Sequence, residues 1–283
     1  MNCYILKKIL SVTTIFGLSV TLLSGCFQNE SPITLTFQPV YKQVTLNCAS
    51  HFNGNNEQLL GAASKNWQYQ QLQFFIHDVE VNTKKNGWQP WSMTTNAHQA
   101  ENVALLGEVC NEEGEQDYWQ LELTPLNEAS VITDIRFTLG VPFALNHLNP
   151  LTQPSPLNEA SMFWGWQGGH KFMRAELASP DDDWLFHLGS TGCKALSPVR
   201  SPKSECLYPN RVVVSLPFTS LITTIEFDLS ALITDITLTR ANSCQSSVDE
   251  ESCKVLFKNL GINTNNTDQS MLFKTNLKAQ IDG

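Results

Sequence analysis

The chain lacks the short motifs that identify several large classes of enzymes and metal proteins. Its 283 residues contain no CxxC pair, no CxxCH haem-attachment motif, no HExxH zinc motif, no GxSxG nucleophile elbow and no P-loop. Cytochrome c, zincin metalloprotease, α/β-hydrolase and P-loop nucleotidase functions therefore have no support in the sequence.

Cationic residues are scarce as well. The chain has 18 Lys and Arg against 27 Asp and Glu, a formal net charge of −9. A surface with this balance argues against nucleic acids and against anionic lipid head groups as partners. It would suit a cationic partner or metal cations.

No long stretch shows the 3.6-residue apolar period of an amphipathic helix, and "ESCKVLFKNLG" is the best short helix candidate. Segments such as "LQFFIHDVEV", "VITDIRFTLGV" and "TTIEFDLSAL" instead alternate β-branched and aromatic residues between Gly, Pro and Asn clusters. This pattern predicts an all-β fold, an antiparallel β-sandwich with long loops and a few short helices. We expect one domain over residues 34–261 and a polar C-terminal tail over 262–283.

The N-terminus has the features of a bacterial export signal. Two lysines precede the apolar stretch "ILSVTTIFGLSVTLL", which is too short and too rich in Ser and Thr for a convincing membrane span. The ending "LSGC" resembles a lipobox, so residues 1–25 are predicted to be a lipoprotein signal peptide, Cys26 the lipidated first mature residue and 26–33 a tether. Phe27 after this cysteine favours outer-membrane anchoring, and an ordinary cleaved secretory peptide is the alternative. Either way, the folded part lies outside the cytoplasm, in the bacterial cell envelope and facing the periplasm.

Six cysteines remain once Cys3 is removed with the signal and Cys26 carries lipid: Cys48, Cys110, Cys193, Cys206, Cys244 and Cys253. An even number in an oxidising compartment indicates disulfides, although six cysteines allow 15 pairings. Short loops favour the pairs 193–206 and 244–253 and leave 48–110 as a long-range pair. A metal–thiolate cluster is the alternative.

The stretch "MFWGWQGGHKFMRAEL", residues 162–177, places Trp164 and Trp166 at strand spacing. Alternate side chains of a strand take opposite faces, so if one indole is in the core the other tends to point outward. An exposed tryptophan is typical of an interface, a ligand site or redox chemistry.

Three histidines lie in or next to strand-like segments: His77 in "FFIHDV", His147 in "PFALNHLNP" and His187 in "LFHLGSTGC". Each alone is more often a hydrogen-bonded structural residue than a metal ligand. With Met162 and Trp164 between them in the sequence, however, they offer imidazole and thioether groups, a combination that suits Cu(I).

The segments "DIRFTLGVPFALNHLNP", "PSPLNEASMFWGWQGGHKFMRAEL", "WLFHLGSTGC", "CLYPNR" and "VALLGEVC" together resemble the MbnP-like family, from about residue 34 to about residue 257. Members of that family are extracytoplasmic copper proteins paired with MbnH, a di-haem cytochrome c peroxidase of the MauG type. The resemblance implies that this partner oxidises the first tryptophan of the WxW motif, here Trp164, to kynurenine. It also implies that high-affinity Cu(I) binding depends on that change.

From the resemblance we predict a copper site made of modified Trp164 with His77 and His187, then His147, and Met162 as a weaker ligand. Asp78 or Glu80 is expected to hold a ligand histidine through its second ring nitrogen. Trp166 is predicted to be an electron relay or part of a docking surface, with a buried core aromatic as the alternative. Where the family has Tyr after the Gly pair this chain has His170, which is a further candidate for joining or flanking the site.

The favoured function is therefore a lipid-anchored copper-binding protein for copper homeostasis or acquisition, which is a substrate of its di-haem partner and not itself an enzyme. Two alternatives remain at this point. One is a mononuclear copper redox enzyme, and the other is a carbohydrate-binding or adhesion β-sandwich that uses its tryptophans without metal.

Overall fold

The structure is a computed structural model that describes residues 31–53, 66–111, 114–126, 131–197, 199–219, 224–262 and 272–275. The predicted signal peptide, Cys26 and most of both the tether and the C-terminal tail lie outside the described residues. No helix in the described ranges has the length and apolar character needed to cross a membrane.

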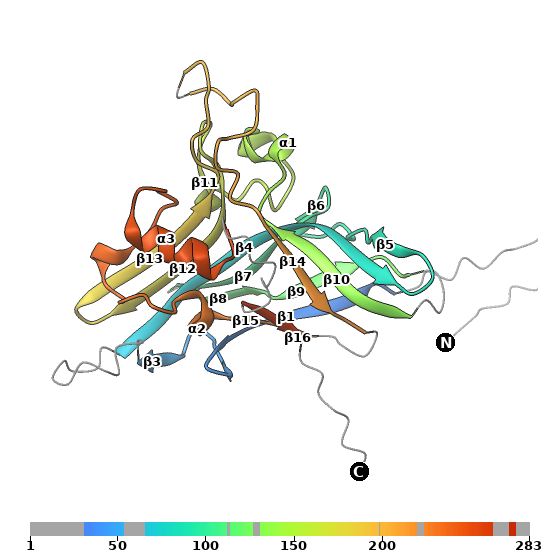
Figure 1. Ribbon diagram of the computed structural model, residues 1–283, viewed down its shortest axis with the longest axis horizontal. Helices are drawn as coiled ribbons and strands as arrows, with labels where there is room; N and C mark the ends of the chain where they lie inside the picture. The colour runs from blue at the N-terminus through green and yellow to red at the C-terminus, as the bar shows by residue number, and fades with distance from the viewer. Residues whose placement is uncertain are drawn as a thin grey trace, which may run out of the picture. The chain divides into compact units, whose positions relative to one another are not determined.

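The larger sheet is organised around one long strand, β4 (Asn66–Thr83). Its central path runs β11-β12-β4-β10-β14, and six further strands pair with members of this path or with one another. Besides β4, the strands of this sheet are β3 (His51–Asn53), β5 (Gly87–Pro90), β6 (Gln99–Ala100), β7 (Val103–Asn111), β8 (Gly114–Tyr118), β10 (Ile132–Leu139), β11 (Phe163–Gly165), β12 (Gly169–Ser179), β13 (Asp182–Gly189) and β14 (Val212–Pro217). Figure 1 shows β4 crossing the sheet between β12 and β10.

The smaller sheet has the order β16-β15-β1-β2, with β9 on β1. Its strands are β1 (Ile33–Tyr41), β2 (Val44–Thr45), β9 (Gln120–Leu123), β15 (Thr224–Asp228) and β16 (Phe273–Thr275). The pair β1 and β15 is parallel, and the other pairs within both sheets are antiparallel. The predicted all-β fold class is confirmed.

Aromatic side chains fill the space between the two sheets. Phe74 of the larger sheet stacks on Phe227 of the smaller sheet with ring centroids 5.5 Å apart, and Phe37 packs edge-on against Phe137 at 5.7 Å. Such rings bury 150–250 Å² each, roughly, and dominate the packing energy of a core. Because this face of β4 belongs to the core, its opposite face is available to polar side chains.

The helices are short. They are α1 (Phe143–Asn146), α2 (Leu229–Leu232), α3 (Glu251–Asn259) and the 3₁₀ turns η1 (Pro150–Thr152), η2 (Ala160–Met162) and η3 (Arg240–Asn242). The longest, α3, is the helix predicted from "ESCKVLFKNLG".

Three disulfides are present: Cys48–Cys110, Cys193–Cys206 and Cys244–Cys253. The pairing favoured from loop lengths is therefore confirmed. The metal–thiolate alternative is wrong for this oxidised structure, because all six thiols are consumed.

The three disulfides are expected to differ in their effect on stability. Cys48–Cys110 closes a separation of 62 residues and Cys244–Cys253 one of 9. Loop-closure entropy then predicts that removing the first costs about 4 kcal/mol of unfolding free energy and removing the second about 2.5 kcal/mol. Urea unfolding of the two Cys→Ser double variants checks this order, and an equal or reversed cost would contradict it.

Candidate functional site

The WxW motif sits on a short hairpin between β11 and β12. Phe163 pairs with His170 and Gly165 with Gly169, so Trp166, Gln167 and Gly168 form the turn. Gly169 has φ +73°, and a Cβ there would lie 2.7 Å from atoms of Asn146. Only glycine fits this position without strain, because it alone tolerates both the left-handed backbone and the close approach.

The indole of Trp164 packs against two glycines, Gly168 and Gly189. A Cβ added at Gly168 would lie 3.3 Å from Cβ of Trp164, and one added at Gly189 would overlap Cζ3 and Cη2 of the indole. The tryptophan is half-buried and also borders a cavity of about 560 Å³, whose wall includes Ser190, Thr191 and Gln245. The indole is therefore held in place on one side and accessible on another.

His187 is anchored in a polar cluster on the adjoining strands. Its Nε2 lies 2.7 Å from Oε1 of Glu176, and Arg174 donates from Nε to the same oxygen at 2.8 Å. Arg174 pairs directly with His187 in the β12–β13 register, so the sheet itself holds these side chains together.

Electrostatics determine which nitrogen of His187 carries the proton. Burial by itself would raise the pKa of the Glu176 carboxyl, but hydrogen bonds from His187 and Arg174 and the charge of Arg174 lower it to about 2. Burial, together with the positive charges of Arg174 and Lys171, lowers the pKa of His187 by more than Glu176 raises it, so at neutral pH the ring is neutral. Its Nε2–H then donates to the ionised Glu176 and leaves a lone pair on Nδ1.

The Nδ1 atom of His187 is buried and has no hydrogen-bond partner among the described residues. A buried polar atom left without a partner is costly, and in a native structure it needs an explanation. A histidine whose other nitrogen is held by a carboxylate is the usual arrangement of a metal ligand. His187 is therefore prepared to donate to a metal through Nδ1.

Trp164 and His187 adjoin the same face of β13. His187 and Gly189 are two residues apart on this strand and therefore project to the same side, and Gly189 is the residue that the indole covers. The structure thus places two of the predicted site residues on the same face of β13, one from the hairpin and one from the strand itself.

His147 lies at the C-terminal end of α1, next to the Cys193–Cys206 disulfide. Its Nδ1 is 3.3 Å from the carbonyl oxygen of Trp166, and its Nε2 is 3.1 Å from Nδ2 of Asn146. Burial lowers the pKa of His147, so the ring is neutral and its Nδ1–H donates to Trp166. The predicted ligand His147 is thereby tied to the backbone of the second tryptophan.

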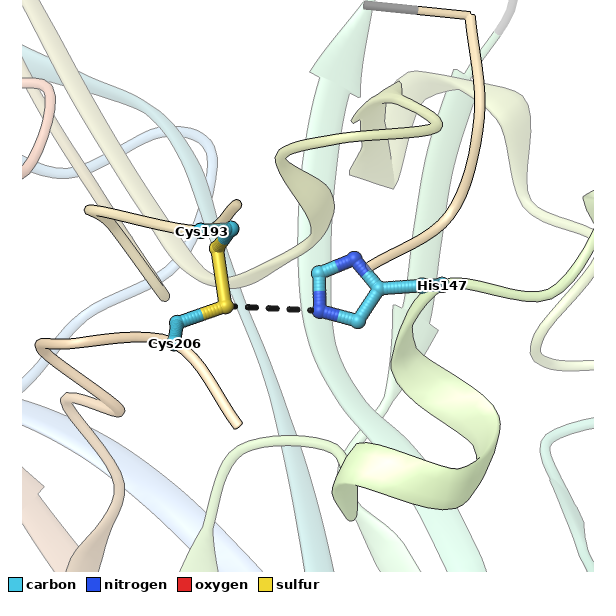
Figure 2. Close-up of side chains that lie close together, drawn as sticks. All are labelled: His147, Cys193 and Cys206. Atoms are coloured by element: carbon cyan, nitrogen blue, oxygen red, sulfur yellow. Dashed lines mark hydrogen bonds between the residues drawn. A yellow bond between two sulfur atoms is a disulfide. The ribbon is translucent and has the colours of Figure 1, made fainter. Parts of the chain in front are cut away.

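The Nε2 atom of His147 points at the disulfide and lies 3.6 Å from Sγ of Cys206 (Figure 2). His147, Cys193 and Cys206 form one of two groups in the described ranges with the spacing of a metal site, and Cys48, Glu108 and Cys110 form the other. In both groups the cysteines are joined as disulfides, which are far weaker ligands than thiolates. Neither group is a thiolate site in this structure.

The strand register separates His77 from His187. The register aligns His187 with Arg174 and Arg174 with Gln73 of β4, four residues before His77. Four residues along a strand and two strands across place His77 and His187 about 16 Å apart, too far for one ion. As predicted, Asp78 contacts His77, with Oδ2 2.9 Å from Nδ1, whereas Glu80 pairs with Arg136.

The remaining predicted residues have structural surroundings. Met162 is fully buried in the core. His170 is also buried, with Nδ1 2.8 Å from the carbonyl oxygen of Asn146 and Nε2 3.0 Å from that of Leu157, so neither nitrogen faces space for a metal. Trp166 is half-buried and borders a second cavity, so it is not a fully buried core aromatic.

Sequence reasoning missed Glu176, Arg174 and Asn146. Glu176 and Arg174 are two residues apart in "FMRAEL", a spacing that places both on one face of a strand next to apolar neighbours. Charges within a largely apolar strand are a signal for a paired polar cluster, and this signal was present. Asn146 gave none, because its contacts depend on how the hairpin folds back.

Comparison with known proteins agrees with this architecture. A sequence model of the MbnP family matches residues 30–246. Among solved structures, MbnP from Methylosinus trichosporium has a similar fold, with a TM-score of 0.68 and 23% sequence identity over 85% of this chain and 91% of that one. A search of curated proteins finds no match. Since the family match covers most of the chain, including the WxW hairpin and β13, the chain belongs to the MbnP family.

Proposed function

We propose that the chain is a lipid-anchored, extracytoplasmic protein that binds Cu(I) at a site completed by oxidation of Trp164 to kynurenine. Membership of the MbnP family points to a copper-related function. The observation that carries the proposal is the position of Trp164: half-buried, against Gly189, on the face of β13 that also holds the unpartnered Nδ1 of His187.

An intact indole is a poor ligand, because its nitrogen lone pair belongs to the aromatic system. Two equivalents of peroxide, consumed by the oxidising enzyme, cleave the C2–C3 bond and add one oxygen atom to each carbon. Hydrolysis then releases C2 as formate, so the five-membered ring is opened and an aryl amine is left. That amine has a lone pair which a soft cation such as Cu(I) accepts. Oxidation therefore converts a side chain that only covers the site into one that binds.

The donor set that remains is small and suited to Cu(I). The core of the site is the kynurenine amine with Nδ1 of His187, whose ring is held by Glu176. His147 lies across the Cys193–Cys206 disulfide, and Cys193 borders the same cavity as Trp164. Met162 is too deeply packed to contribute without a change in the core.

The oxidant in this proposal is a di-haem cytochrome c peroxidase of the MauG type, because a haem partner supplies redox chemistry that no side chain of this protein offers. The protein is then a substrate of that enzyme and has no turnover of its own. Cys26 would carry the lipid that anchors it in the cell envelope, facing the periplasm at the outer membrane. The role is copper homeostasis or acquisition.

Oxidation at Trp164 is checked by intact mass. Protein co-expressed with the di-haem peroxidase is expected to gain about four mass units, since kynurenine has one carbon fewer and one oxygen more than tryptophan. Trp164→Phe should abolish the gain, whereas Trp88→Phe, on the distant strand β5, should retain it. An unchanged mass in the wild-type protein would reject the maturation step.

Copper affinity should depend on the His187–Glu176 pair. His187→Ala is expected to lower the Cu(I) affinity of the matured protein by at least about tenfold, and Glu176→Gln by about tenfold, because losing the partner of a ligand commonly costs 10–100-fold. His51→Ala, at an exposed histidine of β3, is the control and should bind like the wild type. The measurement is competition with a chromophoric Cu(I) chelator, and normal affinity in His187→Ala would remove that residue from the site.

The pH dependence of copper binding follows from burial of His187. Its pKa lies below the ordinary value of 6.5, so the ring is neutral above that pH and protons compete with the metal only at lower pH. Cu(I) affinity should therefore stay constant from about pH 8 down to pH 6.5 and fall as the pH drops further. A decline that begins above pH 7 would show that His187 titrates like an exposed histidine.

A further inference from the structure

The segment between β13 and β14 concentrates positive charge on an acidic chain. Residues 190–211 contain four cations and a single acid, whereas the whole chain has a net charge of −9. Arg211 is paired with that acid, Glu205, at 3.1 Å. The other three cations, Lys194, Arg200 and Lys203, are exposed, and no described carboxylate forms an ion pair with them.

Exposed apolar side chains gather in the same place. Leu196 is 82% exposed, Val199 73% and Leu207 68%. Leu148 and Leu151, also exposed, follow His147, whose carbonyl accepts a hydrogen bond from Oγ of Ser201. These five are most of the large exposed hydrophobic residues in the described part of the chain. A cluster of this kind marks a contact surface, whereas single exposed residues are ordinary.

Two of these apolar residues, Leu196 and Val199, line a cavity of about 570 Å³ that Trp166 also borders. Lys194, Leu196, Val199, Arg200 and Lys203 form much of the rest of its wall. The two tryptophans of the motif therefore border different cavities. Trp164 borders the one near Gly189, and Trp166 borders this cationic and apolar hollow.

Three interactions hold the segment to the rest of the protein. The Cys193–Cys206 disulfide closes it, and Gln167 of the hairpin donates a hydrogen bond to the carbonyl oxygen of Cys193 at 2.8 Å. The hydroxyl of Ser201 donates a hydrogen bond to the carbonyl oxygen of His147. Figure 1 shows this segment rising beyond α1 and β11 at the same end of the sandwich. A surface that is already held in shape loses less conformational entropy when a partner binds.

We propose that residues 194–197 and 199–207, the docking loop, bind a protein partner that presents carboxylates around an apolar projection, with Trp166 beneath the contact. The carboxylates would meet Lys194, Arg200 and Lys203, and the projection would enter the hollow beside Trp166. The inference rests on the proposed function in one respect: it takes this partner to be the enzyme that oxidises Trp164. A concave surface favours a protein side chain over a flat anionic bilayer, which would require a convex apolar face.

The test uses the MauG-type di-haem cytochrome c peroxidase of the source organism as the probe. The KM and kcat for oxidation of Trp164 are measured by mass for the wild type and for the triple variant Lys194→Glu, Arg200→Glu, Lys203→Glu. We expect KM to rise at least about tenfold at low ionic strength with kcat little changed, because reversing charges at the rim of a contact slows the association of the two proteins. The difference should shrink at about 0.5 M salt.

The matched control reverses three exposed lysines elsewhere, Lys84, Lys85 and Lys258, and so changes the net charge by the same amount. It should keep the wild-type KM. A second variant, Leu196→Ser with Val199→Ser, should raise KM in a manner independent of salt. Unfolding midpoints equal to that of the wild type show that the loop variants are folded.

The outcomes separate this inference from the proposed function. If the peroxidase leaves the wild type unoxidised, the proposed function fails, and calorimetric binding of the same two proteins still tests the docking loop. Equal KM or equal affinity in the wild type and the triple variant would overturn the inference. It would also be overturned if the triple variant lost only self-association, or only binding to phosphatidylglycerol vesicles, because the loop would then serve a second copy or a membrane.

Discussion

The close approach of the Trp164 indole to the backbone of Gly189 is the contact on which the rest of the site depends. A methyl group at position 189 would overlap the ring, so the contact requires a glycine at that point of β13. The strand in turn places His187 on the same face, two residues before the glycine. A large aromatic group is thereby held beside a histidine, by backbone geometry and not by flexible side chains.

The polar cluster around His187 explains how a histidine can be kept both buried and available. A half-buried carboxylate of low pKa, Glu176, holds one nitrogen of His187 and so leaves the lone pair on the other. Arg174 compensates the charge of Glu176, which would otherwise be costly within a largely apolar sheet. The unpartnered Nδ1 of His187 lowers the stability of the fold locally, and the rest of the structure compensates for this loss, as is common at functional sites.

The two tryptophans of one short hairpin have different environments. Trp164 packs against Gly168 and Gly189, while Trp166 borders a hollow lined by cations of the loop that the Cys193–Cys206 disulfide closes. His147 connects the two regions, since it contacts the carbonyl of Trp166 on one side and the disulfide on the other. This arrangement separates the surface where a partner would dock from the residue that we propose it modifies.

Local patterns in the sequence were sufficient for the fold class, the helix at Glu251–Asn259 and the disulfide pairing, because each depends on short-range periodicity or loop length. The choice among the histidines was different. His77, His147 and His187 have similar strand-like contexts, and only the register of β4, β12 and β13 separates His77 from His187. Register arises from pairing between residues that are distant in the chain, so tertiary structure alone decided which imidazole shares the face of β13 that the indole covers, and which carboxylate bonds to that imidazole.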